Sequence, residues 1–199
     1  MIDLKGKSFV IFGQKGQGKS TLADYILNQK GDAGIYYDTQ WEAPISSKYD
    51  VLRPDDKYST AEICAVMKQV RLIKHYDILV IDESNRFAPA KPKPLPDELA
   101  EWNDSCRHFN KGFGCICRRP TQLHQDITEL ADWLFIYRLT GKNDVKYLNE
   151  INAGLGDALL ELPDFHFLAV GPDKKWSVQP PIQPSKKWVK YAAQLIKDA

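Results

Sequence analysis

The stretch SFVIFGQKGQGKS, residues 8–20, decides the fold. It begins with a mostly apolar run, continues through a glycine-rich loop and leads into a helical pattern that extends to about Gln29. From Gly13 to Ser20 it fits G-x-x-x-x-G-K-[ST] at every specified position. A strand, a glycine-rich loop and a helix in this order predict a phosphate-binding loop at the edge of an α/β sheet.

The residue types of this loop suit a nucleoside triphosphate. Its glycines let the backbone curl so that N–H groups point at phosphate oxygens, and the following helix adds its positive N-terminal dipole. We expect Lys19 to contact the β- and γ-phosphates and Ser20 to bind Mg²⁺. ATP and Mg²⁺ are therefore the predicted cofactors, and the predicted nucleotide-binding residues are Gly13, Gln14, Lys15, Gly16, Gln17, Gly18, Lys19, Ser20 and Thr21.

An acidic pair follows another apolar segment, in YDILVIDES at residues 76–84. The carboxyl ends of strands are where open α/β sheets bind ligands. Asp82 is suited to hold Mg²⁺, directly or through water, and Glu83 to orient and polarise the water that attacks the γ-phosphate. Because a kinase has less need of a water-activating carboxylate, the pair favours hydrolysis over phosphate transfer to a substrate.

Short apolar segments alternate with helical patterns along the chain, and the 199 residues suit one domain. The pattern predicts an α/β fold with a mostly parallel central sheet flanked by helices, followed by a C-terminal β-hairpin and helix. We expect the ATPase domain to occupy residues 1–180, and a Pro-rich linker with a helical tail to occupy 181–199. Strands are expected at 8–12, 35–37, 49–52, 77–81, 114–117 and 133–139, the hairpin at 165–170 and 176–179, and helices at 19–29, from 59 or 60 to about 73, 99–109, 143–162 (with a break near 154–156) and 186–197.

The composition is that of a globular protein, with 43% hydrophobic residues and a net charge of +1. Since the chain is not strongly basic, any contact with DNA must come from a local patch or from several subunits together. No apolar run reaches the roughly 18–20 residues of a membrane span, and the N-terminus lacks a signal-peptide pattern. We therefore expect an intracellular protein whose four cysteines are free thiols; zinc is the weaker interpretation of Cys106, His108, Cys115 and Cys117.

Several motifs together resemble the HerA–FtsK superfamily of P-loop ATPases, which pump or translocate DNA. The likeness covers most of residues 5–150, and its specific parts are the apolar–Asp-Glu–x-x-Arg-Phe pattern and the run that ends in CRRPTQL. The segments that carry it are GQKGQGKST (13–21), YYDTQWE (36–42), ILVIDESNRFAP (78–89), CRHFNKGFGCICRRPTQL (106–123) and DWLFIYRLTGKNDVKYL (132–148).

The resemblance implies a RecA-like fold of the ASCE class and a motor that hydrolyses ATP to move double-stranded DNA. The small size resembles the genome-packaging ATPases of viruses with internal membranes, so the destination it implies is a viral capsid. It further implies a homo-oligomeric ring, hexameric in the family, with non-specific contacts to the DNA backbone. A capsid vertex or a membrane protein is a candidate docking partner, and this chain itself is not expected to insert into a membrane. The expected location is the cytoplasm. For a viral protein, this means the cytoplasm of the host or the virion.

ATPases of this kind often need an arginine from the neighbouring subunit. The resemblance makes Arg107 the first choice in trans, and the other candidates are Arg86, Arg118 and Arg119. Where the family usually has a glutamine sensor, this sequence has Arg118; it either contacts the γ-phosphate or points away while Gln122 supplies the amide. The predicted catalytic residues are Lys19, Glu83, Arg107 and Arg118.

Three other functions compete with DNA packaging. The first is an ATPase that drives phage assembly or protein secretion, as in the zonula-occludens-toxin-like group; the second is a small-molecule or nucleotide kinase; the third is a nucleotide-binding module without hydrolysis. The sequence offers basic residues for DNA contact in a Pro-rich loop, near residue 111 and in the tail: Lys91, Lys93, Lys111, Lys186, Lys187 and Lys190.

Overall fold

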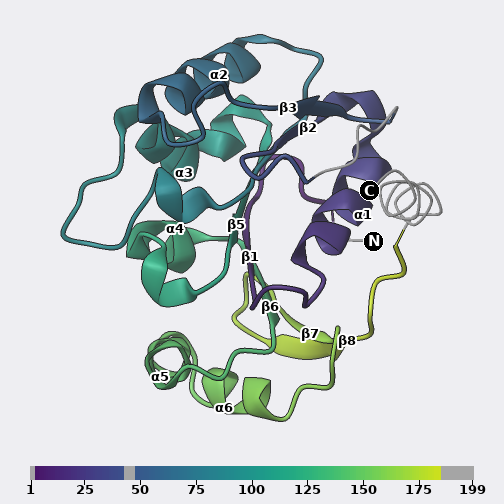
Figure 1. The fold of residues 1–199 in the computed structure, drawn as a ribbon, viewed down its shortest axis with the longest axis vertical. Coiled ribbons are helices and arrows are strands. Elements are labelled where there is room, and N and C mark those ends of the chain that lie inside the picture. The colour runs from purple at the N-terminus through teal and green to yellow at the C-terminus, as the bar shows by residue number, and fades with distance from the viewer. Residues whose placement is uncertain (1–2, 43–47, 185–199) are drawn as a thin grey trace, which may run out of the picture.

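A computed structural model describes residues 3–42 and 48–184 of the chain. Within these ranges an eight-stranded sheet crosses the molecule in the order β3-β2-β4-β5-β1-β6-β7-β8 (Figure 1). The strands are β1 (Ser8–Phe12), β2 (Gly34–Tyr37), β3 (Asp50–Leu52), β4 (Ile78–Ile81), β5 (Gly112–Cys117), β6 (Trp133–Tyr137), β7 (Phe167–Val170) and β8 (Trp176–Gln179). The α-helices are α1 (Lys19–Lys30), α2 (Thr60–Leu72), α3 (Asp97–Phe109), α4 (Gln125–Leu130), α5 (Lys142–Ile151) and α6 (Leu155–Leu160), with 3₁₀ turns at Gly31–Ala33, Ser84–Arg86 and Pro120–Gln122.

The strands from β1 to β6 are parallel, and the β7–β8 hairpin adds two antiparallel strands at one edge. β5 lies between β1 and β4, so an additional strand separates the strand before the glycine-rich loop from the strand before Asp82. Phe12 pairs with Cys117 and Ile81 with Cys115, which brings the carboxyl ends of these strands to one edge. This order confirms the predicted mostly parallel, RecA-like ASCE sheet.

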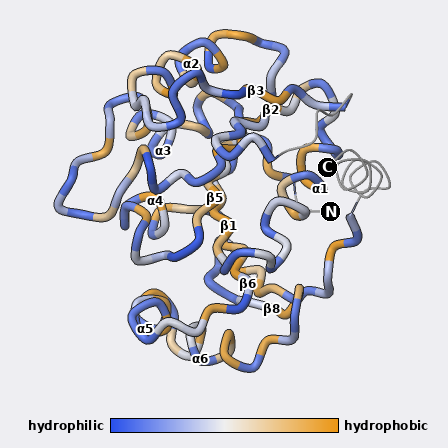
Figure 2. Tube along the Cα trace, viewed as in Figure 1, coloured by the Kyte–Doolittle hydropathy of each residue, from blue (hydrophilic) through white to orange (hydrophobic). Residues whose placement is uncertain are grey.

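The two faces of the sheet are covered unequally. Alternate residues of the central strands point to opposite faces, as the pleat requires: Val10 packs with the cluster that includes α2 to α6, and Ile11 packs with α1. Figure 1 shows α2, α3 and α4 on one side of the sheet and α1 on the other. The apolar colouring in Figure 2 follows the central strands. Since both faces are covered there, the strands are short continuous apolar runs rather than alternating ones.

Most of the expected elements are present with shifts of one or two residues at their ends. Ser59 caps α2, because its hydroxyl accepts a hydrogen bond from the Glu62 N–H at 3.1 Å. The expected helix 143–162 is two helices, separated where Gly154 adopts a left-handed φ of 81°. The short helix α4 was not predicted.

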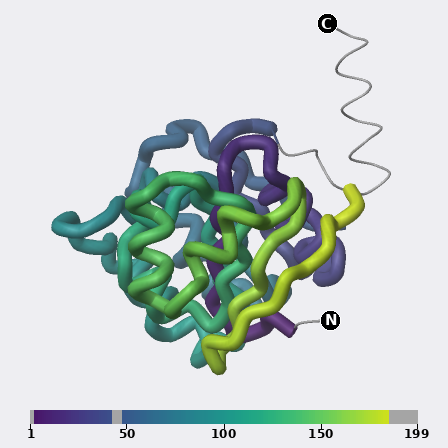
Figure 3. The backbone as a smooth tube through the Cα atoms, turned by 90° about the horizontal axis from the view of Figure 1, so that it is seen from below, coloured from purple at the N-terminus to yellow at the C-terminus, as the bar shows by residue number. Residues whose placement is uncertain are grey.

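The C-terminal hairpin is confirmed, with Phe167 opposite Gln179. Seen from below in Figure 3, this hairpin forms one side of the molecule beside α5 and α6. The expected helix at 186–197 lies outside the described residues, and the division at residue 180 stays a prediction. In residues 3–42 and 48–184, no helix combines the length and the apolar composition needed to cross a bilayer.

Candidate active site

The loop between β1 and α1 has the backbone shape that a phosphate cradle needs. Gly13, Gly16 and Gly18 have φ values of 156°, 82° and 104°. Gly13 is also required by close packing, because a Cβ atom there would lie 2.6 Å from the Cβ atom of Tyr137. The Tyr137 hydroxyl donates a hydrogen bond to the Gly18 carbonyl at 3.1 Å. β6 therefore supports the loop from beneath and leaves its exposed side to a ligand.

Lys19 lies over this loop. Its Nζ donates a hydrogen bond to the Gln14 carbonyl at 3.0 Å. Burial lowers the pKa of Lys19, whereas the nearby Glu83 and Asp82 carboxylates act to raise it. The ammonium thus lies between the loop and the acidic pair, which is where the outer phosphates of a bound triphosphate would need a positive charge.

A small cavity beside the loop is lined by oxygen-bearing side chains. Its volume is about 70 Å³, enough for about two waters. Ser20 comes from the start of α1 and Asp82 from the end of β4, as predicted. The remaining lining residues are Asp24, Tyr36, Asp38, Glu42 and Tyr49. Hydroxyl and carboxylate oxygens are the ligands that Mg²⁺ prefers, so these residues fit the predicted metal.

Asp24 and Asp38 were not among the predicted site residues. Asp24 lies four residues after Ser20 on α1, and this spacing places both on one face of the helix. The Asp24 carboxylate accepts a hydrogen bond from the Tyr49 hydroxyl at 2.8 Å. Asp38, directly after β2, is buried, and Arg53 approaches it to 3.4 Å. Asp38 belongs to the segment YYDTQWE, which carries part of the family resemblance, but its burial beside Asp82 could not be predicted from the sequence spacing.

The surroundings of Asp82 disfavour a negative charge on its side chain. Its side chain is buried, and burial together with the neighbouring Glu83 raises the pKa of the Asp82 carboxyl to about 7. Buried carboxylates that repel one another can remain ionised when a divalent cation compensates them. The raised pKa is consistent with a metal-binding role for this residue.

Glu83 follows Asp82 in a strained conformation. Its φ is 47°, in the left-handed region, which costs a non-glycine residue about 1–3 kcal/mol. The Glu83 Oε1 accepts a hydrogen bond from the Arg118 Nε at 2.7 Å. Arg118 follows β5, the strand next to β4, so the sheet brings the two side chains together. In this structure Arg118 is a partner of the carboxylate.

Arg107 lies near the amino-terminal ends of the parallel strands, whereas the glycine-rich loop lies at their carboxyl ends. It is near the end of α3, just before Gly112 begins β5, whereas Arg118 follows the end of β5. The six residues of β5 span about 20 Å. The Arg107 side chain is 72% exposed and its guanidinium lies 3.5 Å from the Asp132 carboxylate. Arg107 is therefore too far away to serve the site of its own subunit.

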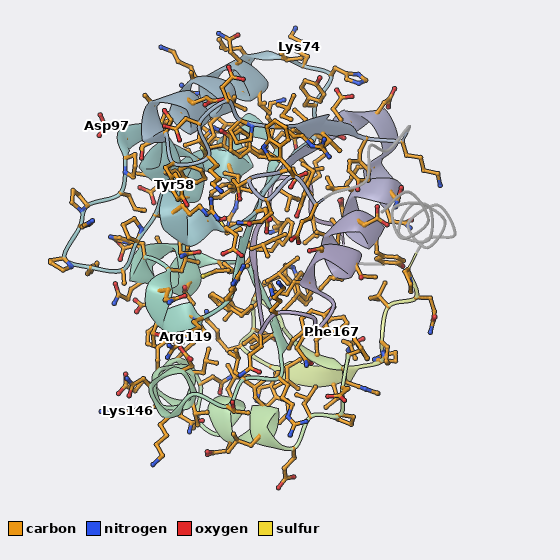
Figure 4. All side chains as sticks on the ribbon, in the orientation of Figure 1. Tyr58, Lys74, Asp97, Arg119, Lys146 and Phe167 are labelled. Atoms are coloured by element: carbon orange, nitrogen blue, oxygen red, sulfur yellow. The ribbon has the colours of Figure 1, made fainter. Side chains whose placement is uncertain are left out.

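The other two arginines have structural partners. Arg119 lies between the end of β5 and α5 (Figure 4), and its Nε donates to the buried Asp144 carboxylate at 2.8 Å. The Arg86 guanidinium lies 5.0 Å from the centre of the Tyr58 ring. Gln122 is exposed in a 3₁₀ turn, and its carbonyl accepts a hydrogen bond from the Ala90 N–H at 3.2 Å.

The prediction that Lys111 could contact DNA is wrong. Lys111 is only 5% exposed, and its Nζ donates hydrogen bonds to the carbonyls of Ile73 and Tyr76. It fastens the segment after α2 and is inaccessible to a phosphate backbone. Lys91 forms an ion pair with Asp126 at 2.8 Å, and Lys93 is exposed on the same loop. The tail residues Lys186, Lys187 and Lys190 lie outside the described part of the chain.

The expected free thiols are found. Cys106, Cys115 and Cys117 are buried and Cys64 is partly buried, all as free cysteines. Burial raises the pKa of Cys115 to about 12, as it does for Cys117. Both side chains belong to the apolar interior that supports the end of β5.

The topology and the site define a P-loop NTPase fold of the RecA-like type. No family model matches the chain. Two curated relatives from Methanocaldococcus jannaschii match 47% of it: a probable DNA double-strand break repair helicase HerA is 26% identical over 95 residues, and a probable helicase is 25% identical over 97 residues. The chain spans 18% of the length of each of these relatives.

Solved structures resemble the chain over most of its length. The genome packaging NTPase B204 of Sulfolobus turreted icosahedral virus 2, in complex with ATP-gammaS, has a TM-score of 0.78 at 20% identity, covering 89% of this chain and 98% of that one. The DNA-packaging ATPase B204 of Sulfolobus turreted icosahedral virus has a TM-score of 0.77 at 16% identity, covering 91% and 100%. The N-terminal domain of zonular occludens toxin from Neisseria meningitidis reaches 0.54 at 13% identity, covering 94% and 98%.

These comparisons confirm the predicted fold and the resemblance to HerA–FtsK ATPases, including the viral packaging ATPases. The two B204 neighbours are genome-packaging NTPases, and one of these structures contains an ATP analogue, which supports the expectation of an ATPase that binds a nucleotide.

The burial of Asp82 has a consequence for stability that depends on pH. An unfolded aspartate has a pKa near 3.9, whereas the folded value is about 7. The unfolded state therefore releases this proton first, and the folded state loses stability as the pH rises between about 4 and 7. Without nucleotide or divalent cation, Asp82→Asn is expected to stabilise the protein at pH 8 by about 2–4 kcal/mol, raising the melting temperature by roughly 5–10 °C.

Thermal unfolding of both proteins at pH 8 and at pH 4 measures this effect. The advantage of the variant is expected to shrink towards pH 4, where Asp82 is also neutral in the wild type. A melting temperature at pH 8 that is lower for Asp82→Asn than for the wild type contradicts this interpretation.

Proposed function

We propose that this chain hydrolyses ATP. The observation that carries the proposal is the convergence of Lys19, Ser20, Asp82 and Glu83 at the edge where β1 and β4 end. The backbone from Gly13 to Ser20 binds the phosphates, and Lys19 neutralises charge on the outermost ones. Ser20 and Asp82 would hold Mg²⁺, which would offset negative charge on the phosphates.

Glu83 supplies the base in this proposal. A carboxylate at this position accepts a hydrogen bond from water and aligns it for attack on the γ-phosphate. Arg118 donates a hydrogen bond to the same carboxylate and holds its orientation. Because Arg118 directly follows β5, the position of this strand determines which way the Glu83 carboxylate points. The kinase alternative does not account for Glu83, which a kinase would not need as a base for water. The presence of Lys19, Ser20, Asp82 and Glu83 together argues against a module that binds a nucleotide without hydrolysing it.

We propose that hydrolysis drives the movement of double-stranded DNA into a viral capsid. The resemblance to genome-packaging NTPases and to HerA helicases supports this function. A homo-oligomeric ring, hexameric as in the family, is the working assembly, in the cytoplasm of a host or in the virion. The position of Arg107 supports a ring. Arg107 is too far from the nucleotide site of its own subunit, so it can act only on a nucleotide bound to a neighbouring subunit.

The Pro-rich loop before α3 is the DNA-contacting element in this proposal. It projects from the body of the molecule beside α3 and α4 (Figure 1). Its lysines Lys91 and Lys93 are exposed where the loop turns. In a ring, one such loop from each subunit would concentrate lysines around the DNA although each subunit carries a net charge of only +1.

ATP hydrolysis measured with and without double-stranded DNA, at two salt concentrations, tests this function. DNA is expected to stimulate the rate, and the stimulation to weaken at the higher salt concentration because phosphate contacts release counterions. Lys93→Ala is expected to weaken DNA binding and to lower the slope of log affinity against log salt by about 1. Lys146→Ala, on the exposed surface of α5 (Figure 4), is the matched control.

Two results would redirect the proposal. ATP hydrolysis that is unaffected by DNA at either salt concentration contradicts translocation and favours the alternative in which a protein is assembled or secreted. Equal salt slopes for the wild type and Lys93→Ala remove the loop lysine from the DNA contact.

A further inference from the structure

A cavity of about 530 Å³ continues from the glycine-rich loop towards the C-terminal part of the chain. Its walls differ in chemistry. The side formed by the loop and the first turn of α1 is polar and includes Lys15, Lys19 and Thr21. The rest of the lining is mostly apolar and consists of Tyr137, Phe165, Pro181, Ile182 and Pro184, with the single amide of Gln183 among them.

The sheet explains why these distant segments meet. Tyr137 ends β6, and Phe167, which begins the antiparallel β7, lies directly opposite it. Gln179 ends β8 opposite the same Phe167. The turn before β7 and the segment after β8 therefore both leave the sheet at the edge where the loop after β1 begins. In Figure 1 the segment after β8 runs from the hairpin towards α1.

Phe165 occupies an unusual backbone position in the turn before β7. The turn is closed by a hydrogen bond from the His166 N–H to the Pro163 carbonyl at 3.2 Å, so Phe165 is its third residue. Its φ is 62°, which favours glycine at such a position. The ring is also 52% exposed at the cavity. Neither the backbone nor the burial of this residue favours a phenylalanine, and strained residues of this kind concentrate at ligand sites.

The chemistry of the apolar wall suits a flat aromatic ligand. A phenylalanine ring can stack on a base, and the prolines and the isoleucine offer the base further apolar contacts. The Gln183 amide has both donors and an acceptor, which match the mixed edge of a nucleobase. The charges of the cavity are confined to the side of the phosphate-binding loop and to Glu42.

We infer that the Phe165 turn and residues 181–184 form the binding site for the purine base of the nucleotide. The base stacks on the Phe165 ring, contacts Pro181 and Ile182, and hydrogen-bonds to the Gln183 side chain. This inference rests on the proposed function, because it requires a triphosphate in the loop from Gly13 to Ser20. The segment after β8 thereby becomes part of the ATP site.

The test compares ATP with inorganic tripolyphosphate, which lacks a base, in equilibrium binding to Phe165→Gly. Loss of base stacking is expected to weaken ATP binding about tenfold and to leave tripolyphosphate binding unchanged. Because glycine tolerates the φ of this position, the melting temperature is expected to be equal or higher. Gln183→Ala is the second variant, with an expected three- to tenfold loss for ATP only. Leu72→Ala, at an exposed residue of α2, is the control.

The outcomes separate this inference from the proposed function. If Phe165→Gly binds ATP as tightly as the wild type does, the base site is elsewhere while the phosphate site stands. If ATP and tripolyphosphate weaken equally, the variant has damaged the phosphate loop, and the assignment of Phe165 to the base is wrong. If the wild type binds neither ATP nor tripolyphosphate, the proposed function fails as well.

Discussion

Glu83→Gln is expected to lower the rate of ATP hydrolysis at least about 100-fold while ATP still binds. Glutamine has the shape of glutamate, but its amide cannot take the proton from water. The Arg118 guanidinium still has an oxygen to which it can donate, so the end of β5 is expected to keep its geometry. The variant also removes a negative charge that faces the triphosphate, and affinity is therefore expected to stay equal or to increase.

Phosphate release and equilibrium binding of ATP, measured on the same preparation, test this expectation. Glu150→Gln is the matched control, because Glu150 is an exposed residue of α5 whose partner is Lys146 on the same helix. Its turnover is expected to equal that of the wild type. Unchanged hydrolysis in Glu83→Gln would remove Glu83 from the role of base, and loss of ATP binding would show that the change acts on the loop instead.

Arg107→Ala is expected to reduce turnover by about 10³–10⁵-fold in the assembled ring. The expected cause is the loss of a positive charge that one subunit supplies to the nucleotide of the next. In its own subunit Arg107 lies at the far edge of the sheet, where its partner is Asp132. Mixing Arg107→Ala with Glu83→Gln subunits is then expected to restore part of the activity, because an intact Glu83 site can receive Arg107 from its neighbour.

Lys7→Ala separates this effect from the loss of an ion pair. Lys7 approaches the same Asp132 carboxylate at 3.6 Å, so its removal also takes a cation away from that group. Hydrolysis by Lys7→Ala is expected to stay near the wild-type rate. If mixed rings form but no activity returns, or if Lys7→Ala is as inactive as Arg107→Ala, then Arg107 does not act in trans.

The parts of the site that are local in sequence could be predicted from it. The loop from Gly13 to Ser20 carries its own glycines, lysine and hydroxyl within eight residues, and Asp82 follows its apolar strand directly. Strands buried on both faces are visible as short apolar runs, which is why most of their bounds were predicted to within two residues.

The parts that depend on pairing between distant segments could not be predicted. Arg118 meets Glu83 across 35 residues because β5 lies beside β4, and the sequence does not indicate this contact. The sensor role of Arg118 stays a prediction. The sequence offers Lys111 as a basic residue for DNA contact, but its side chain is buried in the fold. Its ammonium donates hydrogen bonds to the carbonyls of Ile73 and Tyr76, which come close to Lys111 only when the chain folds.

In the proposed mechanism a triphosphate lies in the loop from Gly13 to Ser20, and Glu83 faces its last phosphate. A crystal structure of the protein grown with Mg²⁺ and a non-hydrolysable ATP analogue tests it most directly. We expect phosphate density against the loop amides, the Lys19 ammonium beside the γ-phosphate, and a water between that phosphate and Glu83. Analogue bound at another place, or Glu83 turned away so that no water can reach the phosphate, would contradict it.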